Sequence, residues 1–344
     1  MLAAQGPPQQ SVIDGHGGHR RHGRLLILTR DVHREARRPR IVVSVANPTS
    51  FNPVVSPVSI LGDGIYPPRM LPTALTIAGL DPSGGAGIVA DLRSFAAAGS
   101  WGAAVCAALT VQSTRGVRAV HPVAAKLIIE QAEEVISDAL VRAIKTGALG
   151  SAANVRTVAR LIERNETIPA VVDPVMLPSR VAGEGEGARL DGAGSIPALQ
   201  RLARVATLVT PNLAEAGALL GATITTDAQA RDAAVALVEA GSHAALVKGG
   251  HGKGAEAVDW LVVGAQTKRI VRIARPRRKT PPLHGTGCTL ASLIAGRLAA
   301  RSVGRLPETN ELVAAVRWAR VRLDAAICTP LTTGRGLLVL GPKP

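Results

Sequence analysis

Residues 74–91 read ALTIAGLDPSGGAGIVAD, and their pattern decides the fold class. Ala74–Ala78 is a short apolar run closed by a glycine, which is typical of a buried strand. In Ala86–Ala98 the apolar residues recur at helical spacing, with Ile88 and Phe95 on the same face. The stretch therefore predicts a strand, a glycine-rich turn and a helix, which together form the start of a βα repeat.

Strand-like and helix-like segments alternate from this point onward. We expect further strands at Ala103–Val111, Ala143–Thr146, Ala170–Asp173, Thr207–Thr210, Ala244–Val247, Val258–Val263 and Lys268–Ile273. We expect further helices at Ala125–Ala139, Val155–Arg164, Leu213–Leu220, Ala228–Ala240, Thr286–Ala300 and Glu311–Ile327. Continuous apolar strands indicate an α/β fold with a mostly parallel central sheet and helices on both faces. Ligands of such sheets bind beyond the carboxyl ends of the strands.

Composition narrows the class of protein. The chain has 344 residues, of which 47% are hydrophobic and only 2% aromatic, so the core must consist of Ala, Val, Leu and Ile. No uninterrupted apolar run is long enough to predict a membrane-spanning helix. Three scattered cysteines exclude a disulfide framework and predict a cytoplasmic location.

The net charge of +15 points to an anionic partner, such as nucleic acid, a membrane surface or a phosphorylated metabolite. The arginine excess is dispersed, and aromatic residues for stacking on bases are few. We therefore expect no specific nucleic-acid partner and no membrane partner.

Residues 1–69 differ from the rest of the chain. They carry Pro-Pro and Gly-Gly pairs and the arginine cluster Arg34–Arg40, but no sustained periodicity and no signal-peptide pattern. Met70 stands directly before the first strand. We predict that the functional domain comprises residues 70–344, and that residues 1–69 are a disordered extension or a mis-assigned upstream start.

Three candidate sites follow predicted strand ends. The glycine-rich turn Gly79–Gly87 lets the backbone approach a ligand closely, and the helix after it offers free N–H groups to an anion. Asp173 places a carboxylate at a strand end. Asn212 and Glu215 share one face of a helix start, which suits a hydrated Mg²⁺ beside phosphates. Each has a structural alternative, since glycine turns can serve packing, Asp173 can cap a turn, and N-x-x-E can be a helix cap.

A fourth candidate site is His284–Thr289, which reads HGTGCT and opens a predicted helix. Consecutive N–H groups there would form an anion hole for a transferring phosphoryl group. At a helix start the pKa of the Cys288 thiol is expected to be lowered, so that a thiolate could accept a proton. Cys288 could equally be a buried small hydrophobic residue.

Together and in this order, the motifs resemble the hydroxymethylpyrimidine/phosphomethylpyrimidine kinases of thiamine biosynthesis, which belong to the ribokinase-like superfamily. The resemblance covers about residues 73–300, and GxDPSGGAGIxAD with HGTGCT separates the family from sugar kinases, which carry Asp where Cys288 stands. The matching segments are residues 74–91, Ala108–Gly116 (ALTVQSTRG), Thr210–Glu215 (TPNLAE), Val247–His251 (VKGGH) and His284–Thr289 (HGTGCT).

The resemblance implies an enzyme that uses ATP and Mg²⁺ to phosphorylate 4-amino-5-hydroxymethyl-2-methylpyrimidine, and then extends the monophosphate to the diphosphate. For the pyrimidine it implies that Gln112 binds the polar edge, that Gly79 and Val175 line the pocket, and that Asp91 supports the site from the first helix. Ala148 stands where the family usually places Met against the ring, so the pocket is expected to be looser.

For the nucleotide, the resemblance implies that Lys248 approaches ATP and that Asp173, Asn212 and Glu215 organise Mg²⁺ and phosphates. The catalytic residues implied are Gly285, Thr286, Gly287 and Cys288, whose amides would stabilise the transferring phosphoryl group. Cys288 also occupies the position of the general base.

Two departures and two alternatives stay open. Arg180 could replace a lysine of the family's usual loop, and the basic, proline-rich segment Pro276–Pro282 could attract phosphates or be a solvated loop. The alternative function is a pyridoxal/pyridoxine kinase of the same superfamily, against which Gln112 and Cys288 count and for which Ala148 leaves room. The sequence leaves the oligomeric state open, with a homodimer among the alternatives.

Overall fold

The structure is a computed structural model that describes residues 70–176, 190, 194–250, 255–302 and 304–343, with the backbone of four short strands before residue 70. The chain divides into two compact units, Met1–Arg69 and Met70–Pro344. In the first unit the described strands form two antiparallel pairs, β1 (Leu26–Asp31) with β2 (Arg40–Val45) and β3 (Ser59–Ile60) with β4 (Ile65–Tyr66).

The boundary between the two units falls at Met70, where the sequence predicts the start of the functional domain. That the preceding segment is an extension or an upstream start stays a prediction. Most residues of that segment lie outside those described. Arg180, in the later loop for which the sequence analysis made a prediction, also lies outside them.

The second unit is built on a nine-stranded sheet of order β13-β12-β11-β10-β9-β8-β5-β6-β7. The six strands from β11 to β6 are parallel. At the edges β7 pairs antiparallel with β6, β12 with β11, and β13 with β12. The strands are β5 (Thr73–Leu80), β6 (Trp101–Ser113), β7 (Gly116–Pro122), β8 (Val141–Thr146), β9 (Ala170–Val172), β10 (Leu208–Val209), β11 (Ala244–Val247), β12 (Glu256–Val263) and β13 (Arg269–Pro276).

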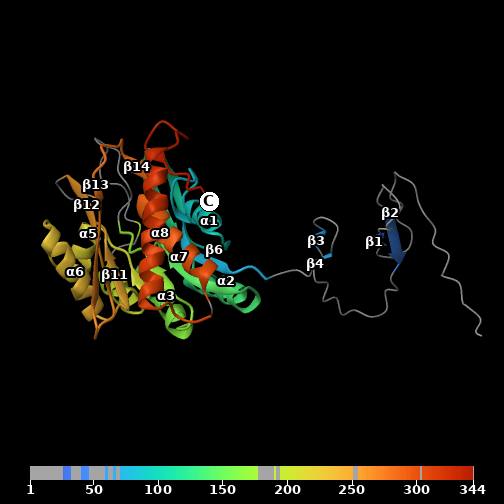
Figure 1. Ribbon diagram of the computed structural model, residues 1–344, viewed down its shortest axis with the longest axis horizontal. Coiled ribbons are helices and arrows are strands. Elements are labelled where there is room, and N and C mark those ends of the chain that lie inside the picture. The colour runs from blue at the N-terminus through green and yellow to red at the C-terminus, as the bar shows by residue number, and fades with distance from the viewer. Residues whose placement is uncertain are drawn as a thin grey trace, which may run out of the picture. The chain divides into compact units, whose positions relative to one another are not determined.

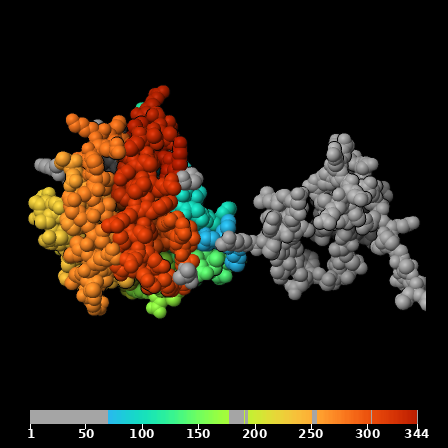
Figure 2. Space-filling model, viewed as in Figure 1, coloured from blue at the N-terminus to red at the C-terminus, as the bar shows by residue number. Residues whose placement is uncertain are grey.

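Helices cover both faces of this sheet (Figure 1). They are α1 (Gly87–Ala98), α2 (Ala125–Asp138), α3 (Ala152–Arg164), α4 (Ile196–Arg204), α5 (Leu213–Leu220), α6 (Asp227–Glu239), α7 (Thr286–Arg301) and α8 (Thr309–Cys328). Helices α2 to α6 pack over one apolar core, and α1, α7 and α8 pack over the other. Figure 2 shows α8, in red, as a ridge across the visible face beside the orange β12 and β13.

The two cores explain why the strands are continuous apolar runs. In β5, Leu75 and Ile77 enter the first core while Ala74 enters the second. A strand that is covered on both faces cannot alternate apolar with polar residues as a half-exposed strand does. The predicted α/β class, with a mostly parallel sheet and helices on both faces, is confirmed.

The predicted strands and helices are present within a few residues of their expected ends, and four further elements were not predicted. These are β7, α4 and a short parallel pair, β14 (Leu283–His284) with β15 (Leu338–Val339). Strand β7 is an edge strand that carries charged and polar residues and ends in a proline, so it lacks the apolar run that marks a central strand. None of the described helices is long and apolar enough to cross a membrane.

Candidate active site

The parallel strands bring the predicted site residues to one edge of the sheet, because their carboxyl ends meet there. Gln112 ends β6, and Asp173, Asn212 and Lys248 follow β9, β10 and β11. Asn212 and Lys248 form a parallel bridge beyond the strands, which extends the sheet at this point. The amino terminus of α7 completes the edge.

Gly79 and Ala148, both predicted to line the pyrimidine pocket, lie next to each other. A methyl group added at Gly79 would lie 3.5 Å from the Ala148 carbonyl oxygen and 3.6 Å from its Cβ. Gly87, which has a φ of +54°, packs so closely that a Cβ there would lie 2.2 Å from the Gly79 carbonyl oxygen. Only glycine fits this close approach of helix start and strand. Val175 is partly exposed after β9.

Asp81 holds the glycine-rich turn together. Its Oδ1 accepts hydrogen bonds from the Ser83 amide (2.8 Å) and hydroxyl (2.7 Å), and its Oδ2 accepts from the Ala86 amide (2.9 Å). Burial raises the pKa of this carboxyl, but hydrogen bonds from His284 and Ser83 outweigh that effect and leave the pKa below its ordinary value. Sequence reasoning missed this role, although Asp81 stands inside the quoted motif.

Gln112 meets His284, the residue that precedes the anion-hole segment. One end of the Gln112 carboxamide lies 3.0 Å from His284 Nε2, which in turn lies 2.8 Å from Asp81 Oδ2. His284 and Asp81 are buried, whereas Gln112 is partly exposed. Gln112, which is predicted to bind the pyrimidine, is therefore joined through His284 to the start of α7.

Asp91, which the resemblance groups with the pyrimidine-binding residues as a supporting residue of the first helix, lies inside the protein and does not contact the substrate itself. It is completely buried, and its carboxylate accepts from Lys145 Nζ (2.8 Å), Ser292 Oγ (2.6 Å) and Thr76 Oγ1 (2.7 Å). A side chain with no exposed surface cannot contact a ligand. Asp91 instead supports the site from beneath through a buried ion pair with Lys145.

Lys145 is a functional candidate that sequence reasoning missed. It is completely buried, and although burial lowers its pKa, the charges of Asp91, Cys288 and Asp173 raise it above its ordinary value. A lysine near the end of a strand that is predicted to be buried is a signal, because a buried lysine requires an acidic partner. Sequence alone could not say that the partner lies on α1.

Lys248 and Asp173 form an ion pair beside the start of α7. The lysine Nζ lies 3.0 Å from Asp173 Oδ1. Burial lowers the pKa of Lys248, but Asp173 and Glu215 together raise it above its ordinary value. A Cβ added at Gly287 would lie 3.2 Å from Lys248 Nζ and 3.5 Å from Asp173 Oδ2. The backbone of the anion-hole segment therefore lies against this ion pair.

Asn212 and Glu215 form a capping box at the start of α5. Asn212 Oδ1 accepts from the Glu215 amide (2.9 Å), and Glu215 Oε2 accepts from the Asn212 amide (2.8 Å). The helix-cap alternative is therefore realised, and the Glu215 carboxyl also interacts electrostatically with Lys248 and Asp173. Burial raises its pKa to about 7, with Lys248 opposing this shift and Asp173 adding to it.

Two neighbouring carboxylates could share a divalent cation. Hydrogen bonds from Thr210 and Lys248 reach Asp173 Oδ1, and the Asn212 amide donates to Glu215 Oε2, so among the described residues the other oxygen of each carboxylate accepts no hydrogen bond. The repulsion between the two groups contributes to the raised pKa of Glu215. Oxygen ligands with few protein contacts suit Mg²⁺, which keeps several waters and binds phosphates. No group of three or more His, Cys, Asp or Glu side chains within the described ranges could hold a metal by itself.

Cys288 corrects one expectation of the sequence analysis. Burial raises the pKa of its thiol to about 11, with Asp173 and Asp91 adding to the shift and Lys145 opposing it. The expected lowering by the helix start is wrong for the chain without ligands, because two carboxylates and loss of water outweigh the helix dipole.

Gly285 begins α7 in a conformation that favours glycine. Its φ is +78°, and a Cβ there would lie 2.0 Å from the Gly85 carbonyl oxygen. The glycine-rich turn after β5 and the anion-hole segment are thus in direct contact. Thr286 and Gly287 follow in the first turn, partly exposed.

The segment after Lys248 is anchored from the side of β12 and β13. The Gly249 amide donates to Asp259 Oδ1 (2.9 Å), and Arg277 donates to the carbonyl oxygens of Gly249, Gly250 and Glu256. Asp259 is completely buried and also accepts from Arg275 (2.9 Å) and Arg320 (3.1 Å). At least one cation of the basic segment Pro276–Pro282 therefore binds backbone.

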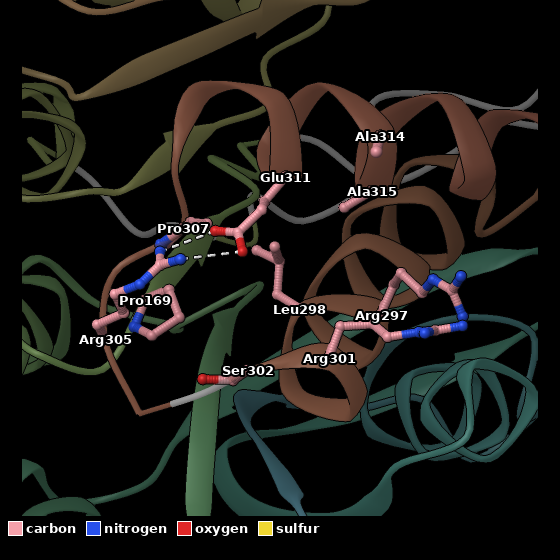
Figure 3. A pocket seen from close by; sticks show the side chains of 10 residues that line it. All are labelled: Pro169, Arg297, Leu298, Arg301, Ser302, Arg305, Pro307, Glu311, Ala314 and Ala315. Carbon is pink, nitrogen blue, oxygen red and sulfur yellow. Dashed lines mark hydrogen bonds and ion pairs between the residues drawn. The ribbon is translucent and has the colours of Figure 1, made fainter.

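A cavity of about 300 Å³ lies elsewhere, between the end of α7 and the start of α8 (Figure 3). Its lining residues are Pro169, Arg297, Leu298, Arg301, Ser302, Arg305, Pro307, Glu311, Ala314 and Ala315. Arg305 and Glu311 pair in it at 2.8 Å. No predicted site residue lines this cavity, which lies at the opposite end of α7 from the anion-hole segment.

The chain is similar to known proteins. The sequence profile of the family described as phosphomethylpyrimidine kinase matches residues 81–340. A hydroxymethylpyrimidine/phosphomethylpyrimidine kinase of Rhizobium meliloti is 40% identical over 78% of this chain and 96% of its own length.

Solved structures agree. A phosphomethylpyrimidine kinase from Clostridium difficile is 33% identical, with a TM-score of 0.60, over 75% of this chain and all of that one. A Bacillus subtilis pyridoxal kinase in complex with ADP is 28% identical, with a TM-score of 0.67, over 80% of this chain and 98% of that one. The fold is ribokinase-like and the enzyme is a kinase; the chain belongs to the phosphomethylpyrimidine kinase family.

Proposed function

We propose that this enzyme uses ATP and Mg²⁺ to phosphorylate 4-amino-5-hydroxymethyl-2-methylpyrimidine, and then its monophosphate to the diphosphate. One observation carries the proposal: the segment around Gly285 joins both halves of the site. On one side His284 contacts Gln112 (3.0 Å), and on the other Gly287 lies against the pair of Lys248 and Asp173. A kinase needs its acceptor and the terminal phosphate on either side of such a donor-rich turn.

On the nucleotide side, backbone amides from Gly285 to Cys288 supply donors where charge builds up on the transferring phosphoryl group. Lys248 neutralises phosphate charge, and Asp173 holds its ammonium group in place. Asp173 and Glu215 would hold Mg²⁺ through their spare oxygens, with Asn212 fixing the turn between them. The cation would neutralise the negative charge of the phosphates.

On the substrate side, Gln112 binds the polar edge of the pyrimidine, and Gly79, Ala148 and Val175 surround the ring. Cys288 stands where a base would take the proton of the alcohol. Because burial raises the pKa of this thiol to about 11, the thiolate is scarce in the free enzyme at neutral pH. Catalysis then depends chiefly on positioning and charge neutralisation, as is general for phosphoryl transfer.

A pyridoxal kinase activity is the second candidate. Two observations favour it: the likeness to the pyridoxal kinase from Bacillus subtilis (TM-score 0.67) and the small side chain of Ala148, which leaves room for a larger ring. The partners are thus small molecules, and we propose a cytoplasmic location. A homodimer stays a prediction.

The test is a comparison of acceptors with the full-length chain. Purified enzyme is incubated with ATP and Mg²⁺ and with the pyrimidine alcohol, its monophosphate or pyridoxal, and kcat/KM is measured for each. We expect mono- and then diphosphate from the pyrimidine at a kcat/KM at least about tenfold above that for pyridoxal. A higher value for pyridoxal would establish the second candidate instead.

Matched lysine variants test the nucleotide side. Lys248→Met should reduce kcat/KM for ATP by about a hundredfold or more, because a buried charge beside the phosphates is lost. Lys126→Met, on the exposed face of α2, should leave it unchanged. Equal values for the two variants would remove Lys248 from the site.

A further inference from the structure

A buried pair reaches from the glycine-rich turn to the residue that is proposed to bind the pyrimidine. His284 is 4% exposed and Asp81 is 3% exposed, and His284 Nε2 lies 2.8 Å from Asp81 Oδ2. The same Nε2 lies 3.0 Å from the Gln112 carboxamide. Gln112 is partly exposed, so the buried pair of Asp81 and His284 contacts a side chain that a ligand can reach.

The partners of Asp81 decide where the imidazole hydrogen sits. The carboxylate accepts from the Ser83 amide, the Ser83 hydroxyl and the Ala86 amide. These three donors stabilise its charged form, so Asp81 is ionised at neutral pH. An ionised carboxylate only accepts hydrogen bonds, so His284 Nε2 must carry a hydrogen and donate it. A nitrogen that donates cannot accept from an amide N–H, so the Gln112 atom that faces it must be the oxygen.

Thr110 leads to the same assignment independently. Its hydroxyl donates its single hydrogen to the Leu80 carbonyl oxygen at 2.8 Å, while the other end of the Gln112 carboxamide lies 3.2 Å from it. A hydroxyl oxygen whose hydrogen is used can only accept. The Gln112 group that faces Thr110 must therefore be the NH₂.

Both contacts are satisfied by one orientation of the carboxamide, since its two ends have the same shape and are distinguished by their hydrogen bonds. The oxygen shares the single Nε2 hydrogen of His284 with Asp81 Oδ2 in a three-centre hydrogen bond, and the nitrogen donates to Thr110. The opposite orientation sets N–H against N–H at one end and oxygen against oxygen at the other. With one bond made at each end, one lone pair and one N–H remain for a ligand.

We propose that Asp81 and His284, with Thr110, orient the Gln112 carboxamide so that it presents a lone pair and an N–H in a set order to the substrate ring. This inference rests on the proposed function, because it takes Gln112 as the residue that binds the pyrimidine. An amino group beside an unprotonated ring nitrogen matches that order. A carbonyl beside a ring N–H reverses it. His284 is thus a positioning residue for specificity.

The test compares two acceptors with the full-length enzyme: the aminopyrimidine alcohol and its analogue with an oxo group in place of the amino group. We expect wild-type kcat/KM to favour the amino compound by at least about a hundredfold, because the analogue leaves buried polar groups unpaired. In His284→Leu the carboxamide is free to turn, so this preference should fall by at least about tenfold. In His284→Gln, which keeps a donor N–H, most of the preference should return.

Controls separate this role from a structural one. His243→Leu, at an exposed histidine before β11, should keep the wild-type preference. The KM for ATP and the unfolding midpoint are measured for each variant. Where His284→Leu does not fold, Thr110→Val removes the other anchor of the carboxamide with little change in volume, and it should also lower the preference.

The outcomes are distinct. A wild-type enzyme that does not phosphorylate the aminopyrimidine refutes the proposed function and this inference with it. A wild-type enzyme that does, together with folded His284→Leu or Thr110→Val variants that keep the full preference, leaves the proposed function standing and overturns the inference.

Discussion

Cys288 shows how far a residue's surroundings can outweigh its place on a helix. It stands in the first turn of α7, where the dipole favours a thiolate, yet burial and two carboxylates raise its pKa to about 11. Lys145 beneath it opposes this shift. The thiol is therefore protonated at neutral pH until a ligand changes its surroundings.

We expect Cys288→Ala to impair the first phosphorylation far more than the second. The alcohol must lose a proton when it attacks, whereas a phosphate oxygen needs little deprotonation. The single-turnover rate of the first step should fall by about a hundredfold, the range of general-base catalysis, and that of the second by less than about threefold. Equal losses in the two rates would show that Cys288 acts only through packing.

Glu215 predicts a pH dependence of Mg²⁺ binding. Burial raises its pKa to about 7, so the carboxylate needed by the cation forms only as the pH rises through that value. Between pH ~6 and pH ~8 its ionised fraction rises about tenfold, and apparent Mg²⁺ affinity should rise by a similar factor. Glu215→Gln should bind Mg²⁺ weakly at both pH values; a retained pH dependence in this variant would assign the titration to another group.

The raised pKa of Glu215 also affects stability. Without Mg²⁺, a rise in pH should lower the free energy of unfolding, whereas it should raise the affinity for Mg²⁺. The folded chain holds the Glu215 proton more tightly than the unfolded chain, whose carboxyl has its ordinary pKa of 4.5. The contribution of this group to the free energy of unfolding therefore falls as the pH rises from that value to about 7. Occupation of the site by a cation would remove this cost.

Among the elements, α7 does most to assemble the site. Its apolar residues pack against β5, β8 and β9, and its first turn carries the anion-hole amides between Gln112 and Lys248. The start of the helix is also locked against the glycine-rich turn, because Gly285 touches the Gly85 carbonyl. A small displacement here would change both halves of the site at once.

Gly285→Ala should therefore reduce activity as well as stability, whereas backbone strain alone would reduce stability only. Both Gly285 (φ +78°) and Gly221 (φ +66°) are left-handed, but only the first would place a Cβ 2.0 Å from backbone, while Gly221 faces open space. Gly221→Ala should lower stability by about 1 kcal/mol with unchanged kcat. Gly285→Ala should lower kcat/KM by at least about a hundredfold. Similar activities in the two variants would contradict this role of α7.

Strand β12 holds the nucleotide side through Asp259. This buried carboxylate joins the Gly249 amide to Arg275 and Arg320, which also pair with Asp324. Asp259→Asn therefore removes the buried charge of this network. We expect a loss of about 3 kcal/mol in the free energy of unfolding. We also expect the KM for ATP to rise by about tenfold as Lys248 moves.

Glu256→Gln is the matched control for Asp259→Asn, since Glu256 is an exposed carboxylate of the same strand, paired with Arg272. It should change neither quantity. If Asp259→Asn is destabilised but keeps the wild-type KM for ATP at saturating pyrimidine, Asp259 contributes to stability without positioning Lys248.

At the scale of the whole molecule, we predict that the unit Met70–Pro344 suffices for catalysis. Both apolar cores and all the site residues named above belong to Met70–Pro344. A unit with its own core can fold alone, so residues 70–344 should retain kcat/KM within about twofold of the full chain. A truncated chain that is folded but inactive would assign residues 1–69 a part in catalysis. Circular dichroism and steady-state kinetics make the comparison.

The sequence by itself determined the α/β class, the positions of most strands and helices, and the motifs that meet at one edge of the sheet. These follow from local signals, because periodicity and glycine turns are written in adjacent residues. Only the tertiary structure decided that Asp91 is buried with Lys145, that His284 joins Asp81 to Gln112, and that the pKa of Cys288 is raised. Ion pairs, hydrogen bonds and pKa values depend on groups from distant parts of the chain, and their distances exist only once the chain has folded.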